Sequence, residues 1–447
     1  MEFLTKFAPN FSEIFKITFL FTFKYYGWVL FVIVVIYMLW RLYRIETMEG
    51  FVESQKWIFL NIRVPRDNLT STLAVESIFS QMHALHVGKT LAETYIEGEI
   101  QLWYSLEIVS FGGKVSFIIR LPKKMKNVVE SAFYSQYPDA EISEIEDYMK
   151  NVIYDPEKPG DVDIWGTEWK LNADYVIPIK TYKDFEHPAA EETVVDPLAP
   201  LFESMTKIDP HEFFGVQIII QPLADNEWQP RGEKKVKELI GEEPEHEMSF
   251  LELFLKPFGW LAGVNYKKAL LAAGHGHGEE IQKSQKNDWM SLTDFQKEKV
   301  GLIEKKIGKQ GYKTKIRFMY MAPDDERFDL TKKSMFTGAY RPLGSEMTNK
   351  LRPDVAKTWT AARYIFSPTL EKPFLDWILK TKKRRMFKGF KGRDTHIGLP
   401  MFVLNTEELA TLFHFPITTE TQRMQASIEQ TQSKKVQPPV DLPVADL

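Results

Sequence analysis

The most distinctive chemical feature of the sequence is a basic run, KTKKRRMFKGFKGR, from Lys380 to Arg393. Eight of its fourteen residues are lysine or arginine, none is acidic, and Phe387 and Phe390 lie between the cations. Such a cluster can neutralise phosphates, while the rings can stack on bases or dip into a membrane surface. We predict phosphate contacts, to nucleic acid or anionic lipid; the alternative is a solvated loop. The predicted contact residues are Lys380, Lys382, Lys383, Arg384, Arg385, Lys388, Lys391 and Arg393.

A second candidate site is the histidine pair His275 and His277 in GHGHGEE, because two imidazoles in one loop can meet a single metal ion. The glycines around them provide no side chain to orient the rings, which favours a solvated loop instead. The pair His211-Glu212 lacks the second histidine that a zinc-binding helix face needs. We therefore predict no metal site and no cofactor.

Motifs for nucleotide binding or hydrolysis are missing from the sequence. GxxxxGK[ST], which would cradle nucleotide phosphates, does not occur, nor do GxSxG or HExxH, and no GxGxxG follows a predicted strand. The zero cysteine count excludes disulfides, thiolate nucleophiles and cysteine-ligated metals. We therefore predict that the protein is not an enzyme and has no catalytic residues. A degenerate enzyme, with a site assembled from distant residues, is an alternative.

The composition predicts a folded chain of two or three domains over its 447 residues. An apolar fraction of 44% and 32 phenylalanines argue against disorder for most of it. The formal net charge is only −4, so no field of the whole molecule attracts nucleic acid. A nucleic-acid partner would have to be held by a local patch.

An apolar segment near the N-terminus predicts a membrane anchor that is not cleaved. Residues Tyr25–Trp40 read YYGWVLFVIVVIYMLW without a charge, although this run is slightly shorter than the roughly 20 residues that span a bilayer. Aromatic rings at both ends suit the headgroup region. The predicted membrane-contact residues are Tyr25, Tyr26, Trp28 and Trp40.

Two alternatives to the anchor are a signal peptide and a buried helix of a soluble core. The segment lies too far from the N-terminus for a signal peptide, and Arg-Leu-Tyr-Arg follows it instead of small residues. Lysine and arginine flank both of its ends, so charge does not give the orientation.

Apolar periodicity beyond the anchor predicts an α+β fold with two ferredoxin-like units. The order βαββαβ is predicted for the first unit, from strands at 58–64, 102–108, 115–121 and 142–145 and helices at 75–85 and 125–133. A similar order recurs in strands at 171–182, 214–221 and 312–320 and helices at 197–207 and 294–309. A last helix is signalled by Asn405 with Glu408 three residues on, a variant of the capping box.

The predicted domains are a membrane anchor (1–45), a ferredoxin-like domain (56–150), a second α+β domain (164–330) with an insertion (223–290), a helical or mixed region (331–416) and a disordered tail (417–447). Within the insertion, Ser249–Val264 carries only two charges. It is either an amphipathic helix for an interface or partner, or a helix packed against its own domain.

Three segments carry a resemblance to a known family: FVLNTEELATLFHFP (Phe402–Pro416), SKKVQPPVDLP (Ser433–Pro443) and DPLAPLFESMTKIDPHEFFGVQIIIQP (Asp196–Pro222). Together they resemble the region before the motor in membrane-anchored conjugative ATPases, the HerA/FtsK-like coupling proteins of bacterial type IV secretion. In that family a PP-x-x-LP segment leads into the ATPase domain. Here the chain ends at Leu447, where that domain would begin.

The resemblance implies a non-enzymatic scaffold of a type IV secretion or conjugation-like machine that translocates DNA or protein. The expected partners are a lipid bilayer, a separate P-loop ATPase, DNA and further copies of this chain. The implied location is the inner membrane, crossed once, with the large domain in the cytoplasm. The alternative function is a nucleic-acid-binding membrane protein without an ATPase partner.

Overall fold

The computed structural model describes residues 2–65, 68, 70–157, 162–185, 195–241, 292–323, 328–361 and 368–416. The segment Ser249–Val264, the pair His275 and His277, and the tail 417–447 lie outside the described residues. The chain divides into two compact units. Unit 1 comprises Met1–Trp57, Val87–Leu102 and Pro122–Lys124, and unit 2 comprises Ile58–His86, Trp103–Leu121 and Met125–Leu447.

Unit 1 is built on one long helix, α1 (Glu2–Ser54), and a short helix, α3 (Leu91–Tyr95). The Trp40 ring stacks on the Tyr95 ring with centroids 6.2 Å apart. Arg44 lies over the Tyr95 ring at 4.7 Å and donates a hydrogen bond to the Thr94 carbonyl at 3.0 Å. These contacts fix the C-terminal part of α1 against the segment that contains α3.

The predicted membrane anchor is wrong. Among the residues that the structure describes, no helix is both long enough and apolar enough to cross a membrane. The apolar stretch Tyr25–Trp40 is part of α1, shorter than the roughly 20 residues that a bilayer requires and bounded by Lys24 and Arg41. The predicted transmembrane helix and the single-pass inner-membrane location are corrected with it.

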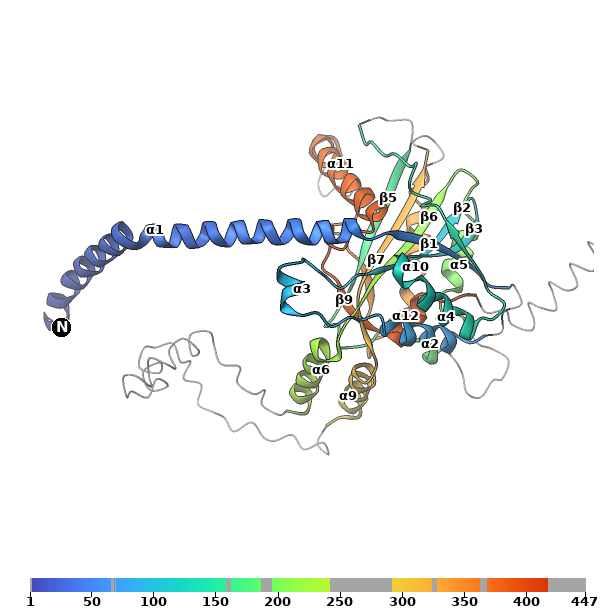
Figure 1. Ribbon diagram of the computed structural model, residues 1–447, viewed down its shortest axis with the longest axis horizontal. Helices are drawn as coiled ribbons and strands as arrows, with labels where there is room; N and C mark the ends of the chain where they lie inside the picture. Colours follow the sequence, from blue (N-terminus) through green and yellow to red (C-terminus); the bar gives the residue numbers. More distant parts are fainter. Residues whose placement is uncertain are drawn as a thin grey trace, which may run out of the picture. The chain divides into compact units, whose positions relative to one another are not determined.

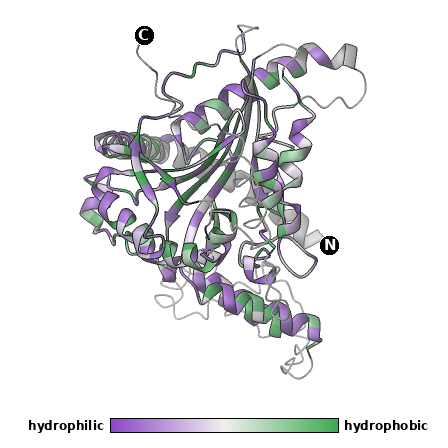
Figure 2. Ribbon diagram, turned by 90° about the vertical axis from the view of Figure 1, so that its right-hand side faces the viewer, coloured by the Kyte–Doolittle hydropathy of each residue, from purple (hydrophilic) through white to green (hydrophobic). Residues whose placement is uncertain are grey.

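The described strands form one nine-stranded sheet in the order β4-β1-β3-β2-β6-β7-β5-β8, with β9 paired to β7 (Figure 1). Hydrophobic residues predominate along its central strands (Figure 2). The strands are β1 (Trp57–Arg63), β2 (Tyr104–Phe111), β3 (Lys114–Pro122), β4 (Glu141–Ile145), β5 (Asp163–Leu171), β6 (Phe213–Pro222), β7 (Gly311–Ala322), β8 (Leu351–Pro353) and β9 (Phe402–Asn405).

The prediction of two ferredoxin-like units behind a transmembrane helix is therefore wrong. The strands of both predicted units belong to the same sheet, because β2 pairs with β6 from Tyr104↔Ile220 to Phe111↔Phe213. Backbone groups that would form the edge of a separate first sheet are used in this pairing. The β2–β6 ladder makes the core of unit 2 continuous.

Helices with apolar faces cover one side of the sheet, where α2, α4 and α12 lie side by side (Figure 1). Phe413, directly after α12, packs against Phe79 of α2 and Phe117 of β3. Gly232 of α6 approaches Ile307 of α9, so these two helices also pack together. The bounds are α2 (Thr72–His83), α4 (Lys126–Gln136), α5 (Ala199–Thr206), α6 (Asp225–Ile240), α9 (Asp294–Ile307), α10 (Lys332–Gly338) and α12 (Thr406–Leu412).

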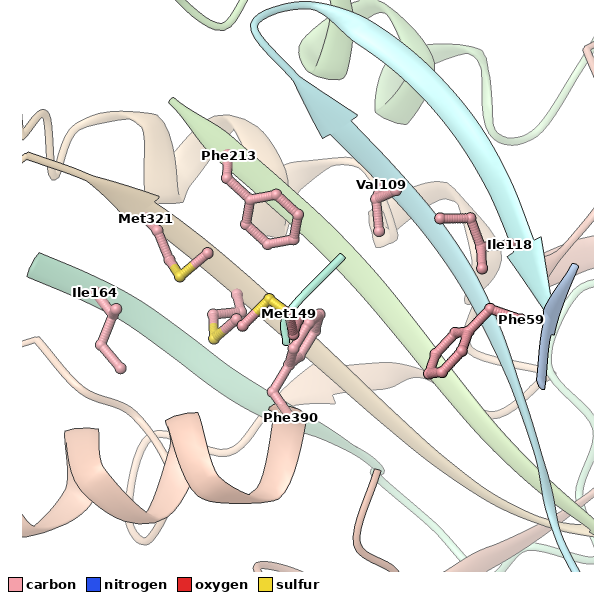
Figure 3. Packing of buried hydrophobic residues seen from close by; sticks show 9 residues of the cluster. Phe59, Val109, Ile118, Met149, Ile164, Phe213, Met321 and Phe390 are labelled. Carbon is pink, nitrogen blue, oxygen red and sulfur yellow. The ribbon is translucent and has the colours of Figure 1, made fainter. Parts of the chain in front are cut away.

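The opposite side of the sheet carries the C-terminal half of α11 (Pro368–Gly392). Its Phe390 is fully buried in an apolar cluster with residues of β1, β2, β3, β5, β6 and β7 (Figure 3). The cluster consists of Phe59, Val109, Ile118, Met149, Ile164, Phe213, Met319, Met321 and Phe390. This core fixes the position of the C-terminal half of α11, which contains most of the basic run.

Candidate nucleic-acid interface on helix α11

The basic run is helical up to Gly392, and the structure sorts its eight cations into two groups. The outer group is exposed: Lys380, Arg384, Arg385 and Lys388. The inner group is partly or fully buried and bonded to other parts of the chain: Lys382, Lys383, Lys391 and Arg393.

Three lysines of the inner group fasten α11 to neighbouring segments. Lys383 donates to both carboxylate oxygens of Asp163 at 2.6 Å. Lys391 donates to the Val152 carbonyl at 2.8 Å, and the Lys382 ammonium donates to a carbonyl of the segment before α11 at 2.8 Å. These three ammonium groups stabilise the fold, because each donates a hydrogen bond to another part of the same chain.

A row of four buried polar side chains crosses the sheet beneath the end of α11, and we call it the polar row. It consists of Glu107 on β2, Gln217 on β6, Arg317 on β7 and Glu168 on β5, adjacent in register. Gln217 donates to Glu107 at 3.1 Å, while Arg317 donates to Gln217 at 3.3 Å and to Glu168 at 2.7 Å. Each residue of the row is at most 1% exposed, so the charges are desolvated and need these partners.

The polar row holds the chain segment that ends α11. Arg317 donates to the carbonyl oxygens of Gly389 at 2.8 Å and Asp394 at 2.7 Å. Gln217 donates to the Phe390 carbonyl at 2.9 Å. A helix leaves its last carbonyl groups without intrahelical partners. Here the Gly389 and Phe390 carbonyls accept bonds from the backbone N–H groups of Asp394 and Arg393, and the side chains from the sheet add a second donor to each. The axis and the rotation of α11 are thereby fixed.

Arg393 extends the polar row at its β2 end. This residue has a left-handed backbone, with φ of 52°, and is only 1% exposed. Its guanidinium donates to Glu107 at 2.9 Å and to Asp147 at 2.8 Å. Burial alone would raise the pKa of Glu107, but Arg393 and hydrogen bonds from Ser105 and Tyr148 outweigh it and lower the pKa. Glu107 is therefore a stable anion in the core.

Two strand glycines allow α11 to lie close to the sheet. A Cβ atom on Gly166 would lie 2.7 Å from the Cγ of Met386, and one on Gly215 would lie 2.8 Å from the Cζ of Phe390. Both distances are too short for non-bonded carbon atoms. Glycine at these positions is what permits the helix and the strands to approach this closely.

The opposite side of α11 forms a cationic outer face. Lys380, Arg384 and Lys388 follow one another at intervals of four residues, and Arg385 lies beside them, so the four share one side of the helix. Trp377, three residues before Lys380, is 67% exposed on that side. Residues 377–392 include no acidic residue, and Arg384 alone of the four has a carboxylate partner among the described residues.

A cavity of about 300 Å³ adjoins the outer face. Trp377, Thr381 and Arg385 of α11 line one side of it, and Lys357 and Gly398 belong to the other. The cavity therefore joins an exposed indole to three cations, Lys357, Lys382 and Arg385, and its one lining carboxylate, Glu168, is paired with Arg317. Such a combination suits a phosphate with a base stacked beside it.

The aromatic residues differ from those that the sequence suggested. Phe390 is fully buried, and Phe387 is half-buried against the apolar cluster, so neither ring is presented for stacking on a base. Trp377, which precedes the basic run, is the aromatic residue that is exposed for stacking on a base. The signal that identifies it is helical spacing, because Trp377, Lys380, Arg384 and Lys388 follow one another at intervals of three or four residues. Of the predicted membrane aromatics, Trp40 stacks within unit 1.

One group of described side chains could hold a metal ion: Asp209, His211 and Glu212. The ammonium of Lys332 already lies 2.9 Å from Asp209 and 2.5 Å from Glu212. Glu212 also accepts a hydrogen bond from Tyr320 at 2.6 Å. The two carboxylates are thus neutralised within the protein, and we assign no metal to them.

A family model described as "Domain of unknown function (DUF8128)" matches residues 52–427. The chain belongs to this family. The DUF8128 region includes every strand of the sheet, the polar row and the whole of α11, whereas nearly all of α1 precedes it. No curated protein matches the chain.

Proposed function

We propose that this DUF8128 protein is a non-enzymatic nucleic-acid-binding platform whose α11 outer face contacts the phosphate backbone. The observation that carries the proposal is the division of the basic run. Four cations remain exposed beside an exposed Trp377, while the other four hold the helix in place. A rigidly seated cationic helix loses little conformational freedom when it binds a polyanion.

The dimensions of the outer face suit a nucleic-acid backbone. Lys380 and Lys388 are eight residues apart, which corresponds to about 12 Å along the helix axis. Duplex DNA carries one charge per roughly 1.7 Å of its axis, so a face of this length can meet several phosphates. The indole of Trp377 adds a stacking surface, which favours single-stranded over purely duplex ligands.

The resemblance to the region before the motor of coupling proteins supports a place for this platform in a translocation machine. In that setting the bound DNA is the translocated substrate, a P-loop ATPase moves it, and several copies of this chain surround it. The β2–β6 ladder and the polar row would give such a platform a stiff core.

The test of the proposal is the salt dependence of DNA binding. We expect the full chain to bind single-stranded and duplex DNA, and the variant Lys380→Ser, Arg385→Ser, Lys388→Ser to bind more weakly. Three lost phosphate contacts should reduce the log–log salt slope by about 2.7 on duplex DNA and by about 2.1 on single strands. The variant should fold normally, because the three cations have no partner among the described residues.

A matched control removes three other exposed lysines, Lys114→Ser, Lys237→Ser and Lys305→Ser, with the same change in net charge. We expect the control to keep the wild-type slope. In addition, Trp377→Ala should weaken binding of single strands by about 1–3 kcal/mol without changing the slope, whereas Trp377→Phe should retain most of the affinity. Equal slopes for wild type, variant and control would refute the proposal.

A further inference from the structure

A second cavity, of about 310 Å³, lies at the β8 edge of the sheet. Residues from β5, α10, the turn after α10 and β8 line it, and none of them belongs to α11. Five of these side chains are important for its chemistry: Trp169, Tyr340, Arg341, Lys350 and Arg352. The cavity is therefore separate from the outer face discussed above.

The charge of this cavity selects an anion. Arg341 and Arg352 are exposed, and neither forms an ion pair with a described residue. Lys350 adds a third cation, although it also pairs with Glu346 four residues earlier. None of the lining residues is acidic. An anionic ligand would thus meet three positive charges without opposing repulsion from a lining carboxylate.

Two buried donors among the lining residues lack a hydrogen-bond partner. The indole nitrogen of Trp169 and the hydroxyl of Tyr340 have none among the described residues, and both side chains are at most 2% exposed. Burial also raises the pKa of Tyr340, so its hydroxyl keeps its proton. Such unsatisfied groups are rare in folded proteins and call for an explanation. The indole can only donate, so what it lacks is an acceptor.

We propose that this cavity binds a small phosphorylated molecule. Its phosphate oxygens would accept hydrogen bonds from the guanidinium groups of Arg341 and Arg352, whose planar donor forks match phosphate geometry. A ligand acceptor would satisfy the Tyr340 hydroxyl or the Trp169 indole nitrogen only after a side-chain rotation, because both atoms are sealed from solvent in the free chain. The volume lies at the lower end of the range for small-molecule sites, which suits a compact ligand.

The test is calorimetric titration of the full chain with pyrophosphate and with inorganic phosphate at fixed ionic strength. We expect saturable binding of pyrophosphate, and the variants Arg341→Gln and Arg352→Gln should each lose about tenfold or more in affinity. Lys388→Gln, an equivalent loss of charge on α11, should bind as the wild type does. Lack of saturation at millimolar pyrophosphate, or equal affinities for all four proteins, would overturn the proposal.

The variant Tyr340→Phe separates a ligand-binding hydroxyl from a purely structural one. Removing an unsatisfied buried hydroxyl should leave the stability of the free chain unchanged or raise it, while the affinity for pyrophosphate falls several-fold. A variant that loses stability but keeps full affinity would show that the hydroxyl serves the fold, and the proposal would fail if the two arginine variants also kept full affinity. Loss of DNA binding has no bearing on this outcome, because the outer face is a different site.

Discussion

Arg317 and Arg393 lie beneath α11, and Lys380, Arg385 and Lys388 lie on its outer face, yet a count of charges treats all five alike. The two arginines are at most 1% exposed and are surrounded by carboxylates and carbonyl oxygens. The other three are exposed and have no partner among the described residues. The comparison shows that the function of a cation in this protein depends on whether its partner is within the chain.

The largest effect should come from breaking the polar row. Arg317→Met removes the cationic partner of Glu168 and the side-chain donor to the Asp394 carbonyl, which should cost about 3–5 kcal/mol of the free energy of unfolding. Lys388→Met on the outer face should change this free energy by less than about 0.5 kcal/mol. Urea denaturation of both variants is the measurement. Similar effects in the two would contradict the distinction between inner and outer cations.

An intermediate effect should follow from separating α11 from the sheet. Gly215→Val places methyl groups where Phe390 lies, and overpacking of this kind typically costs about 1–3 kcal/mol. If the seat of α11 also orients the outer face, the variant should bind DNA more weakly although no cation has changed. An unchanged free energy of unfolding in Gly215→Val would show that α11 does not pack closely against β6.

The smallest effect, counted per pH unit, concerns Lys315, a buried cation next to the polar row. Its ammonium donates to the carbonyls of Thr395 at 2.6 Å and Ile397 at 2.9 Å, and burial lowers its pKa to about 8. The unfolded chain, with a lysine pKa near 10.4, therefore binds more protons between about pH 8 and pH 10.4. Lys315 should make the free energy of unfolding rise with pH in this window.

The measurement for Lys315 compares wild type with Lys315→Met by urea denaturation at several pH values. From about pH 8 to pH 10.4, the wild type should gain on the variant by at most about 1.4 kcal/mol per pH unit. Nearby groups that could contribute are Glu168, Arg317 and Asp394. Parallel pH dependences for the two proteins would indicate that Lys315 keeps an ordinary lysine pKa when folded.

Local patterns in the sequence predicted several elements well. The apolar run 214–221 corresponds to β6 (Phe213–Pro222), and the capping box of Asn405 and Glu408 begins α12 as expected. In contrast, the strand predicted at 171–182 is wrong, since β5 ends at Leu171. The strand that the prediction missed contains Glu168. A glutamate is expected to be exposed, and its burial is explained only by its ion pair with Arg317.

The candidate site could be predicted only in part, for the same reason. Clustering of charge identified the right helix, but the partners that remove Lys383 and Arg393 from its surface are Asp163 and Glu107, more than 200 residues away in sequence. The continuous sheet could not be predicted either, because no local sequence pattern specifies that β2 pairs with β6.

The link between Glu107 and Arg393 spans 286 residues, and this has a consequence for biosynthesis. A ribosome releases the chain from its N-terminus at about 5–20 residues per second, so Glu107 leaves the exit tunnel well before its counterion exists. Until then Glu107 lacks the guanidinium that contributes most to keeping it charged, and the native core cannot close. A nascent chain truncated before Arg393 is therefore expected to stay sensitive to protease, whereas one extended past Phe415 becomes resistant.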